Sequence, residues 1–185
     1  MNEVLKTIAK RRSIRQFGPG QISDDNLNAI LEAALQAPSG HNDQSWFFSV
    51  IQDQKLIKEL SDGSKLEMQK SPIPWMVKLA QNESVNIYHN APTVIIAAAK
   101  KDAVTPLADV CAAIENLLLA ATSLNLGSCW IGFTKYNFTS PEKNKRIGIP
   151  DGYEVHYGVA LGPLPENQKL APPERKYKQY FKVIK

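Results

Sequence analysis

PLADVCAAIENLLLAATSL, residues 106–124, consists almost entirely of apolar or small side chains. A helix with this composition has no broad polar face, so it has to be covered on nearly all sides. The cover comes from the same domain or from a second subunit, and we expect a second copy of the chain to supply much of it. Gly127 is the expected stop after this helix.

Strands are predicted before and after this helix. Thr93–Ala99 is an uninterrupted apolar run that predicts a central strand, and the aromatic and β-branched run Trp46–Ile51 predicts a second buried strand. Tyr153–Gly162 predicts a further strand, and Ser128–Gly132 a short turn or strand.

Helical patterns lie between these strands. The predicted segments are Val4–Ala9, Ser23–Leu35, Gln54–Leu66, Ser140–Gly148 and, as a mixture of helix and loop, Met68–Asn90. Strands that alternate with helices, without a repeat or a linker, predict a single α+β domain over residues 1–185.

The composition fits one compact domain. The 185 residues are 43% hydrophobic and 22% charged, which is ordinary for a soluble globular chain. Cys111 and Cys129 lie in apolar stretches, and no signal peptide pattern opens the sequence. The windows Pro92–Ala99 and Val110–Leu126 are too short or too interrupted to span a bilayer. We therefore expect a cytoplasmic protein without a membrane span.

The net charge of +4 is concentrated in two segments, Lys10–Arg15 and Arg175–Lys178. Two short segments offer too few cations for a long nucleic-acid track, but they suit one phosphate group if the fold brings them together. The aromatic residues occur in core-like runs and are not interleaved with lysine and arginine, so a small RNA-binding domain is the weaker alternative.

Signatures of several large enzyme classes are absent from the sequence. There is no Gly-rich dinucleotide fingerprint, no phosphate loop ending in Lys-Ser/Thr, no paired cysteine motif and no His-Glu-x-x-His. His41, His89 and His156 are far apart in sequence, so neither a metal site nor a histidine triad has local support. We expect no metal, and each histidine alone is more often structural.

Five segments in order carry a resemblance to a known family. They are Arg11–Arg15, Ala37–Trp46, Gly127–Gly132, Gly148–Tyr153, and Arg175 behind a proline-rich stretch. Each segment alone is weak evidence of a family, but five segments in the same order and at suitable distances are a specific match. Over essentially its whole length, the chain resembles the nitroreductase family.

The resemblance implies a three-layer sandwich, in which helices flank a central, mostly antiparallel sheet, and an intertwined homodimer with FMN at the interface. Hydride is then expected to pass from NADH or NADPH through flavin N5 to small electrophilic acceptors, such as nitroaromatics and quinones, in a ping-pong cycle. No side chain has to act as acid or nucleophile, because the cofactor carries the chemistry. Alternatives are dehalogenation, flavin modification, and a flavin store or sensor without turnover.

The same resemblance assigns the basic segments to the cofactor. Arg11, Ser13 and Arg15 are expected to contact the FMN phosphate, the ribityl hydroxyls and the electron-rich flavin edge, with Arg12 close by. Arg175 is expected to complete the phosphate site. Arginine forks pair well with phosphate and with the N1/O2 edge. The plainer interpretation is a solvated helix end and a solvated tail.

A polar loop before the second strand resembles the family loop that reaches the flavin from the other subunit. Its cofactor-binding candidates are Pro38, Ser39, Gly40 and Gln44. His41, in the same loop, is the candidate for substrate contact. Ser45 stands where the family often has proline, which puts the stiffness of the loop in doubt. The plainer interpretation is a surface turn.

Trp130, Ile131 and Gly132 resemble the segment whose backbone covers one flavin face and directs an amide towards N5. A core strand in which Trp130 merely packs is the plainer interpretation. Cys129 is expected to be a buried structural thiol. Because the chain is short for the family, we expect the helical cover of the pocket to be reduced in Met68–Asn90, which leaves an open, permissive site.

Overall fold

The computed structural model describes residues 1–166 and 182–184. Its elements in chain order are α1 (Glu3–Lys10), α2 (Asp24–Leu35), the 3-10 helix η1 (Gly40–Asn42), β1 (Trp46–Ile51), α3 (Gln54–Met68), α4 (Pro74–Gln81), β2 (Thr93–Lys100), α5 (Pro106–Ser123), β3 (Leu126–Ile131), the 3-10 helix η2 (Gly132–Asn137), α6 (Pro141–Arg146) and β4 (Tyr153–Pro163). Each predicted strand and helix has a counterpart among them.

The four strands form one antiparallel sheet in the order β1-β2-β4-β3. Ile95 of β2 pairs with Val50 of β1 on one side and with Val159 of β4 on the other, and Val159 also pairs with Trp130 of β3. The residues of β2 from Thr93 to Ala99 are all buried, as expected for a central strand with both faces covered.

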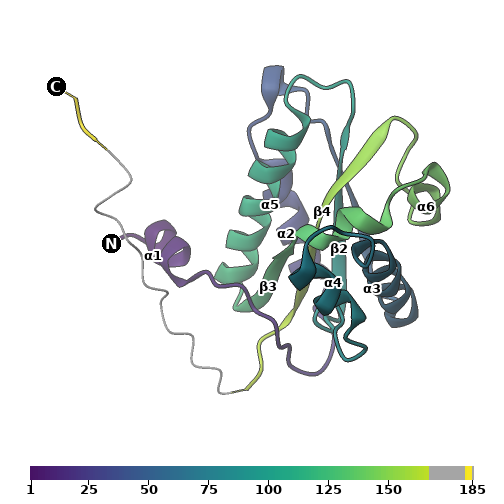
Figure 1. Ribbon diagram of the computed structural model, residues 1–185. Helices are drawn as coiled ribbons and strands as arrows, with labels where there is room; N and C mark the ends of the chain where they lie inside the picture. Colours follow the sequence, from purple (N-terminus) through teal and green to yellow (C-terminus); the bar gives the residue numbers. More distant parts are fainter. Residues whose placement is uncertain (167–181, 185) are drawn as a thin grey trace.

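Helices cover both faces of this sheet (Figure 1). Ile95 and Ala97 of β2 face a core that is shared with α2 and α5, whereas Val94 and Ile96 face a second core that is shared with α3. The two-residue alternation of a strand thus serves two cores at once. The predicted three-layer α+β sandwich is confirmed.

The apolar helix α5 is enclosed by its own domain on one face. Its buried side chains are Asp109, Val110, Ala113, Ile114, Leu117, Leu118, Ala121 and Thr122. Leu107, by contrast, is 48% exposed. The prediction that a second subunit covers α5 therefore applies only to the face of α5 that its own domain leaves exposed. In the described part of the chain, α5 is the one helix long and apolar enough to cross a bilayer, a test that core helices also pass.

The expected role of Gly127 as a helix stop is wrong. The helix α5 ends at Ser123, and the chain turns at Asn125, which takes up the left-handed conformation with φ of 57°. Gly127 lies inside β3, where a Cβ atom would come within 2.8 Å of the Ile14 side chain. Asparagine tolerates the left-handed region, so the turn needs no glycine, and Gly127 serves a close approach instead.

Candidate functional site

The N-terminal segment that follows α1 runs along the outer edge of β3. Ser13 forms a parallel bridge with Ser128, and the Ile14 amide donates to the Ser128 carbonyl at 2.9 Å. The Ile14 side chain is only 4% exposed and lies against Gly127. This anchor fixes the backbone of the segment, so Arg15 lies beside the end of β3.

A cavity of about 210 Å³ opens at this place. Its lining residues are Arg15, Leu79, Val85, Ile87, His89, Cys129, Trp130, Ile131, Gly132 and Phe133. Four of the predicted cofactor residues, Arg15 and Trp130 to Gly132, therefore come together although more than 110 positions separate them. Leu79 of α4 and Val85 and Ile87 of the chain before β2 supply apolar side chains to the remaining wall.

The electrostatics of the cavity are set by burial and by Arg15. Burial lowers the pKa of His89, and the Arg15 cation lowers it further. Burial raises the pKa of the Cys129 thiol, although Arg15, Ser13 and Arg11 oppose this. The buried thiol therefore stays protonated, as expected for a structural cysteine.

Trp130 has a structural role as well as its place in the lining. Its ring meets the Tyr157 ring edge-on, with centroids 5.1 Å apart, and it packs against the core under α2 and α5. The plainer interpretation of Trp130 is thus correct for its side chain. Its backbone, at the end of β3, remains part of the cavity wall.

The other basic residues lie close to α1 and α5. Arg11 Nε lies 3.4 Å from Glu115 Oε1 on α5. Arg12 donates to the Ala9 carbonyl at 2.7 Å and to the Arg11 carbonyl. Arg175 lies outside the described residues. The predicted union of the two basic clusters therefore remains a prediction.

The predicted cofactor loop around Gly40 is held by a buried carboxylate that sequence patterns did not single out. Asp109 of α5 is 2% exposed. It accepts from the Gly40 amide at 3.0 Å, from Ser45 Oγ at 2.7 Å and from Thr105 Oγ1 at 2.7 Å. Burial opposes ionisation of Asp109, but the bonds from Ser45, Thr105 and Gly40 outweigh it and lower its pKa. Ser45 thus ties the loop down where the family often uses proline.

The same loop has an unusual backbone. His41, Asn42 and Gln44 all lie in the left-handed region, with φ of 51°, 59° and 46°. The Ser39 hydroxyl accepts from the Gln44 amide at 3.0 Å. Non-glycine residues in this region cost energy and cluster at ligand sites, so the surrounding bonds have to compensate for the strain.

Within one chain, this loop contributes no residue to the lining of the Arg15 cavity. Asp109, in the first turn of α5, holds the loop. Among the described residues, no hydrogen bond or ion pair joins Pro38–Gln44 to a residue that lines the cavity. His41 is exposed in this loop.

Sequence patterns missed His89 and the apolar lining from α4. His89 and Asn90 form a polar pair directly before Pro92 and the buried strand β2, and a polar loop on a rigid strand is a place where function concentrates. That signal was available but is weak, because any strand has to be entered through a loop.

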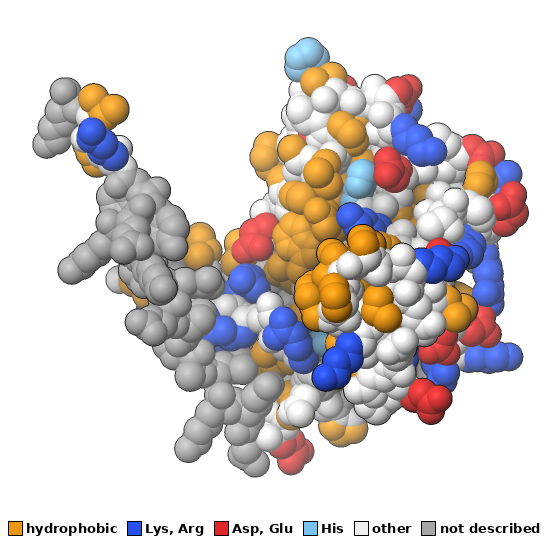
Figure 2. All heavy atoms as spheres, in the orientation of Figure 1, with side chains coloured by type: hydrophobic (Ala, Val, Ile, Leu, Met, Phe, Trp, Pro, Cys, Tyr) orange, Lys and Arg blue, Asp and Glu red, His pale blue; other side chains and the backbone are white. Residues whose placement is uncertain are grey.

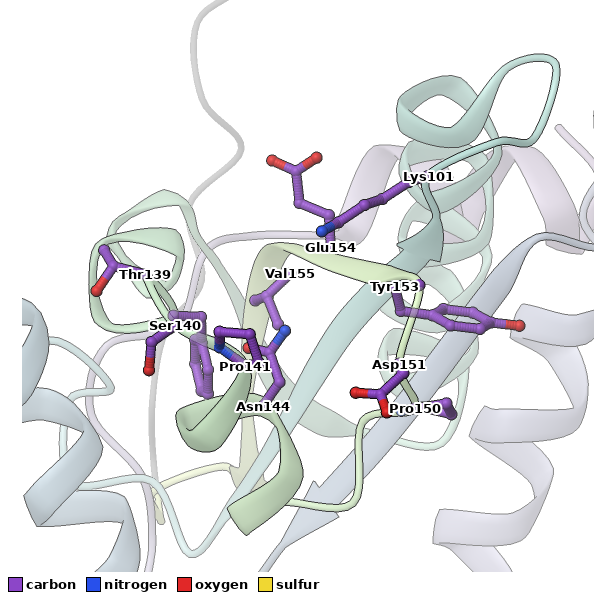
Figure 3. Close-up of a pocket in the computed structure, with 12 residues that line it drawn as sticks. Lys101, Thr139, Ser140, Pro141, Asn144, Pro150, Asp151, Tyr153, Glu154 and Val155 are labelled. Carbon is purple, nitrogen blue, oxygen red and sulfur yellow. The ribbon is translucent and has the colours of Figure 1, made fainter.

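A larger hollow, of about 460 Å³, lies elsewhere (Figure 3). It is bounded by α6 and by the turn into β4, with Lys101, Asp151 and Glu154 as its charged residues. It contains none of the predicted cofactor residues. Within the described ranges, no group of three or more histidine, cysteine or acidic side chains could hold a metal ion.

Comparison with known proteins gives a consistent result over the length of the chain. A sequence profile described as the nitroreductase family matches residues 8–163. A protein of Archaeoglobus fulgidus, described as an NADH dehydrogenase or NAD(P)H nitroreductase, is 34% identical over 173 residues, which cover 91% of this chain and 89% of the relative.

Solved structures agree with this match. A nitroreductase with bound FMN from Bacteroides fragilis superposes with a TM-score of 0.91 at 35% identity, and the match covers 100% of both chains. A nitroreductase with bound FMN from Desulfitobacterium hafniense superposes with a TM-score of 0.89 at 31% identity, again over 100% of both chains.

Proposed function

The chain belongs to the nitroreductase family, and from this premise we propose that it is an FMN-dependent oxidoreductase that transfers hydride from NADH or NADPH to small electrophilic acceptors such as nitroaromatics and quinones. The observation that carries the proposal is the meeting of Arg15 with Trp130, Ile131 and Gly132 around one cavity. Relatives with bound FMN support the choice of cofactor.

The chemistry of the cavity fits a flavin ring. Leu79, Val85 and Phe133 offer apolar surface for a flat aromatic system, and Arg15 offers a cation for its electron-rich edge. A Cβ atom added at Gly132 would meet nothing within 4 Å, so the backbone is open there to close approach. Ser128 Oγ is buried without a hydrogen-bond partner in the described chain, which leaves one polar atom available beside the segment.

When bound, FMN supplies an N5 atom that accepts and returns hydride, so that nicotinamide and acceptor use the same space in turn in a ping-pong cycle. The protein supplies position and charge. Arg15 would stabilise negative charge at the N1/O2 edge, with Arg11, Arg12, Ser13 and Arg175 towards the phosphate and ribityl chain. Among the described residues, no aspartate or glutamate lines the cavity, and hydride transfer itself needs no nucleophile from the protein.

We further propose that a homodimer completes each site. Within one chain, Pro38, Ser39, Gly40 and Gln44 contribute nothing to the cavity lining, so a second copy would bring its own loop to the cavity, with His41 towards the substrate. Hydrophobic side chains gather over α5 in Figure 2. Val4, Leu5 and Ile8 of α1, together with Leu107, are exposed and would be covered.

The cytoplasm is the proposed compartment. Both cysteines of the chain, Cys111 and Cys129, are free thiols. A reducing compartment keeps such thiols unpaired.

An anaerobic absorbance scan of the purified protein, reconstituted with FMN if it is colourless, tests the proposal. NADH or NADPH is expected to bleach the spectrum of the bound oxidised flavin, and a quinone or nitroaromatic is expected to restore it. Absence of flavin binding would remove the cofactor assignment. Binding without bleaching would instead favour a flavin store or sensor.

A further inference from the structure

His89 lines the cavity in a conformation that its own loop enforces. His89 and the following Asn90 both adopt the left-handed backbone, with φ of 56° and 54°. The His89 amide donates to the Asn86 carbonyl at 2.9 Å, and Asn86 Oδ1 accepts from the Tyr88 amide at 2.8 Å. These bonds close a tight turn, and an unfavourable backbone persists only where the surroundings determine it.

Helix α3 holds this turn from the other side. Ser61 Oγ accepts from the Ile87 amide at 3.0 Å. Lys65, which is buried, donates from Nζ to the carbonyls of Asn82 at 2.7 Å and Val85 at 3.0 Å. Tyr88, directly before His89, is fully buried. The main chain on both sides of His89 is therefore fixed, so the fold itself determines the position of His89 in the cavity wall.

The cavity contains three groups that can carry charge or exchange protons: Arg15, Cys129 and His89. Arg15 is a permanent cation. The Cys129 thiol is neutral, since burial raises its pKa. Burial and Arg15 both lower the pKa of His89, so its imidazole is neutral at pH 7. A neutral base thus lies next to a single fixed cation.

We propose that His89 is an additional residue of the flavin site, and that its imidazole takes up a proton when the bound flavin is reduced. The inference rests on the proposed function. Reduction by a nicotinamide adds two electrons and one proton, as hydride, and leaves one extra negative charge beside Arg15 and His89. A second proton, taken from water, converts the imidazole to imidazolium and balances that charge.

This proton has a use in the second half of the cycle. A quinone that becomes a hydroquinone needs one hydride and one proton. The hydride comes from the reduced flavin, and the imidazolium of His89 gives back its proton, which returns both groups to their starting state. His89 therefore stores the proton that the acceptor requires.

The sign of the pH dependence follows from the neighbours. Burial and Arg15 hold the pKa of His89 below its ordinary value of 6.5, and the neutral ring system of oxidised flavin would add no charge that raises it. An added negative charge raises the pKa. At a pH between the His89 pKa of the oxidised state and that of the reduced state, reduction takes up one more proton than in a protein without this histidine. The midpoint potential of the flavin therefore rises more steeply as the pH falls.

The test measures the midpoint potential of the FMN-loaded enzyme between pH 5 and pH 9 for the natural protein, His89→Gln and His156→Gln. The potential of the natural protein is expected to rise above that of His89→Gln as the pH falls through the window, by about 30 mV for each pKa unit that reduction adds to His89. His156 is the matched control, because it is also half-buried with a lowered pKa but does not line the cavity.

A second measurement covers the case in which His89→Gln does not fold. The pKa of His89 in the natural holoenzyme is read from the NMR signals of 15N-labelled histidine in both redox states, with His41→Gln and His156→Gln to assign the three signals. A higher pKa after reduction supports the inference. An unchanged pKa of His89, or parallel potential curves for the natural protein and His89→Gln, overturns the inference about His89. If the protein still binds flavin and NAD(P)H still bleaches it, the proposed function stands. Failure to bind FMN overturns the proposed function itself.

Discussion

Arg15 is the only permanently charged side chain among the described residues that line the cavity. Arg15→Gln is expected to weaken FMN binding on the order of 10- to 100-fold, since a hydrogen bond to a charged group contributes roughly 1.5–3 kcal/mol. Quenching of flavin fluorescence during titration of the apoprotein measures the change.

Arg146→Gln is the matched control for Arg15. Its guanidinium pairs with Glu59 on the surface, away from the cavity. The control is expected to bind FMN as the natural protein does. Equal weakening in both variants would mean that net charge, and not the position of Arg15, governs binding.

Asp109 is expected to matter for stability, because three donors converge on its buried carboxylate. Asp109→Asn presents an amide hydrogen to one of these donors and is expected to lower the free energy of unfolding by about 2 kcal/mol. Urea denaturation at pH 7 measures this. Asp102→Asn, which removes an exposed partner of Lys100, serves as the control and is expected to change stability little.

The contribution of Asp109 depends on pH in a definite direction. Its pKa in the folded protein lies below the ordinary value of 3.8. The stabilisation is therefore complete above the unfolded pKa and is lost as the pH falls through the folded pKa. Unfolding curves of the natural protein and Asp109→Asn are expected to approach each other below pH 4. A constant gap down to pH 2 would contradict this assignment.

At the scale of elements, the cover of the cavity is slight. Only α4, eight residues long, and the chain up to His89 lie over it from the segment Met68–Asn90. We expect comparable turnover rates for a small benzoquinone and a bulky polycyclic nitroaromatic, measured by the same NAD(P)H oxidation assay. A rate difference of several hundredfold between them would show that the site is selective.

The elements differ in how well the sequence predicts them. β2 and α5 are predictable, because both are long apolar runs and their different lengths, 8 and 18 residues, distinguish a strand from a helix. The stop of α5 at Asn125 is not, since either asparagine or glycine can turn the chain, and only the packing of Ile14 explains Gly127. The position of Asp109 inside an apolar helix carries no sign of its partners Gly40 and Ser45, because these come from a loop more than 60 residues earlier.

The site is predictable in the same uneven way. Arg15 and the segment Trp130–Gly132 meet as the family resemblance implies. The polar pair His89 and Asn90 is only a weak local signal, so the role of His89 emerges only once the turn before β2 is known. The loop Pro38–Gln44 does not line the cavity within one chain, and a test of its role needs the assembled molecule.

At the scale of the whole molecule, we expect dimer formation and flavin binding to be lost together. Leu107→Glu places a charge on the uncovered face of α5 and is expected to shift the protein towards monomer and to lower its FMN content. Sedimentation velocity combined with flavin absorbance measures both. Leu66→Glu on α3, where the natural leucine is 62% exposed, is the control and is expected to change neither. A monomeric Leu107→Glu with full FMN content would contradict a shared site.

The segment that holds Arg15 also protects the sheet. β3 is the last strand in the order β1-β2-β4-β3, and one side of it would otherwise present free amide and carbonyl groups. Ser13 and Ile14 occupy part of that side through their pairing with Ser128. Exposed strand edges recruit other chains into aggregates. The residues just before Arg15 therefore also protect this edge against aggregation, and a chain that lacks residues 1–15 is expected to lose solubility together with flavin binding.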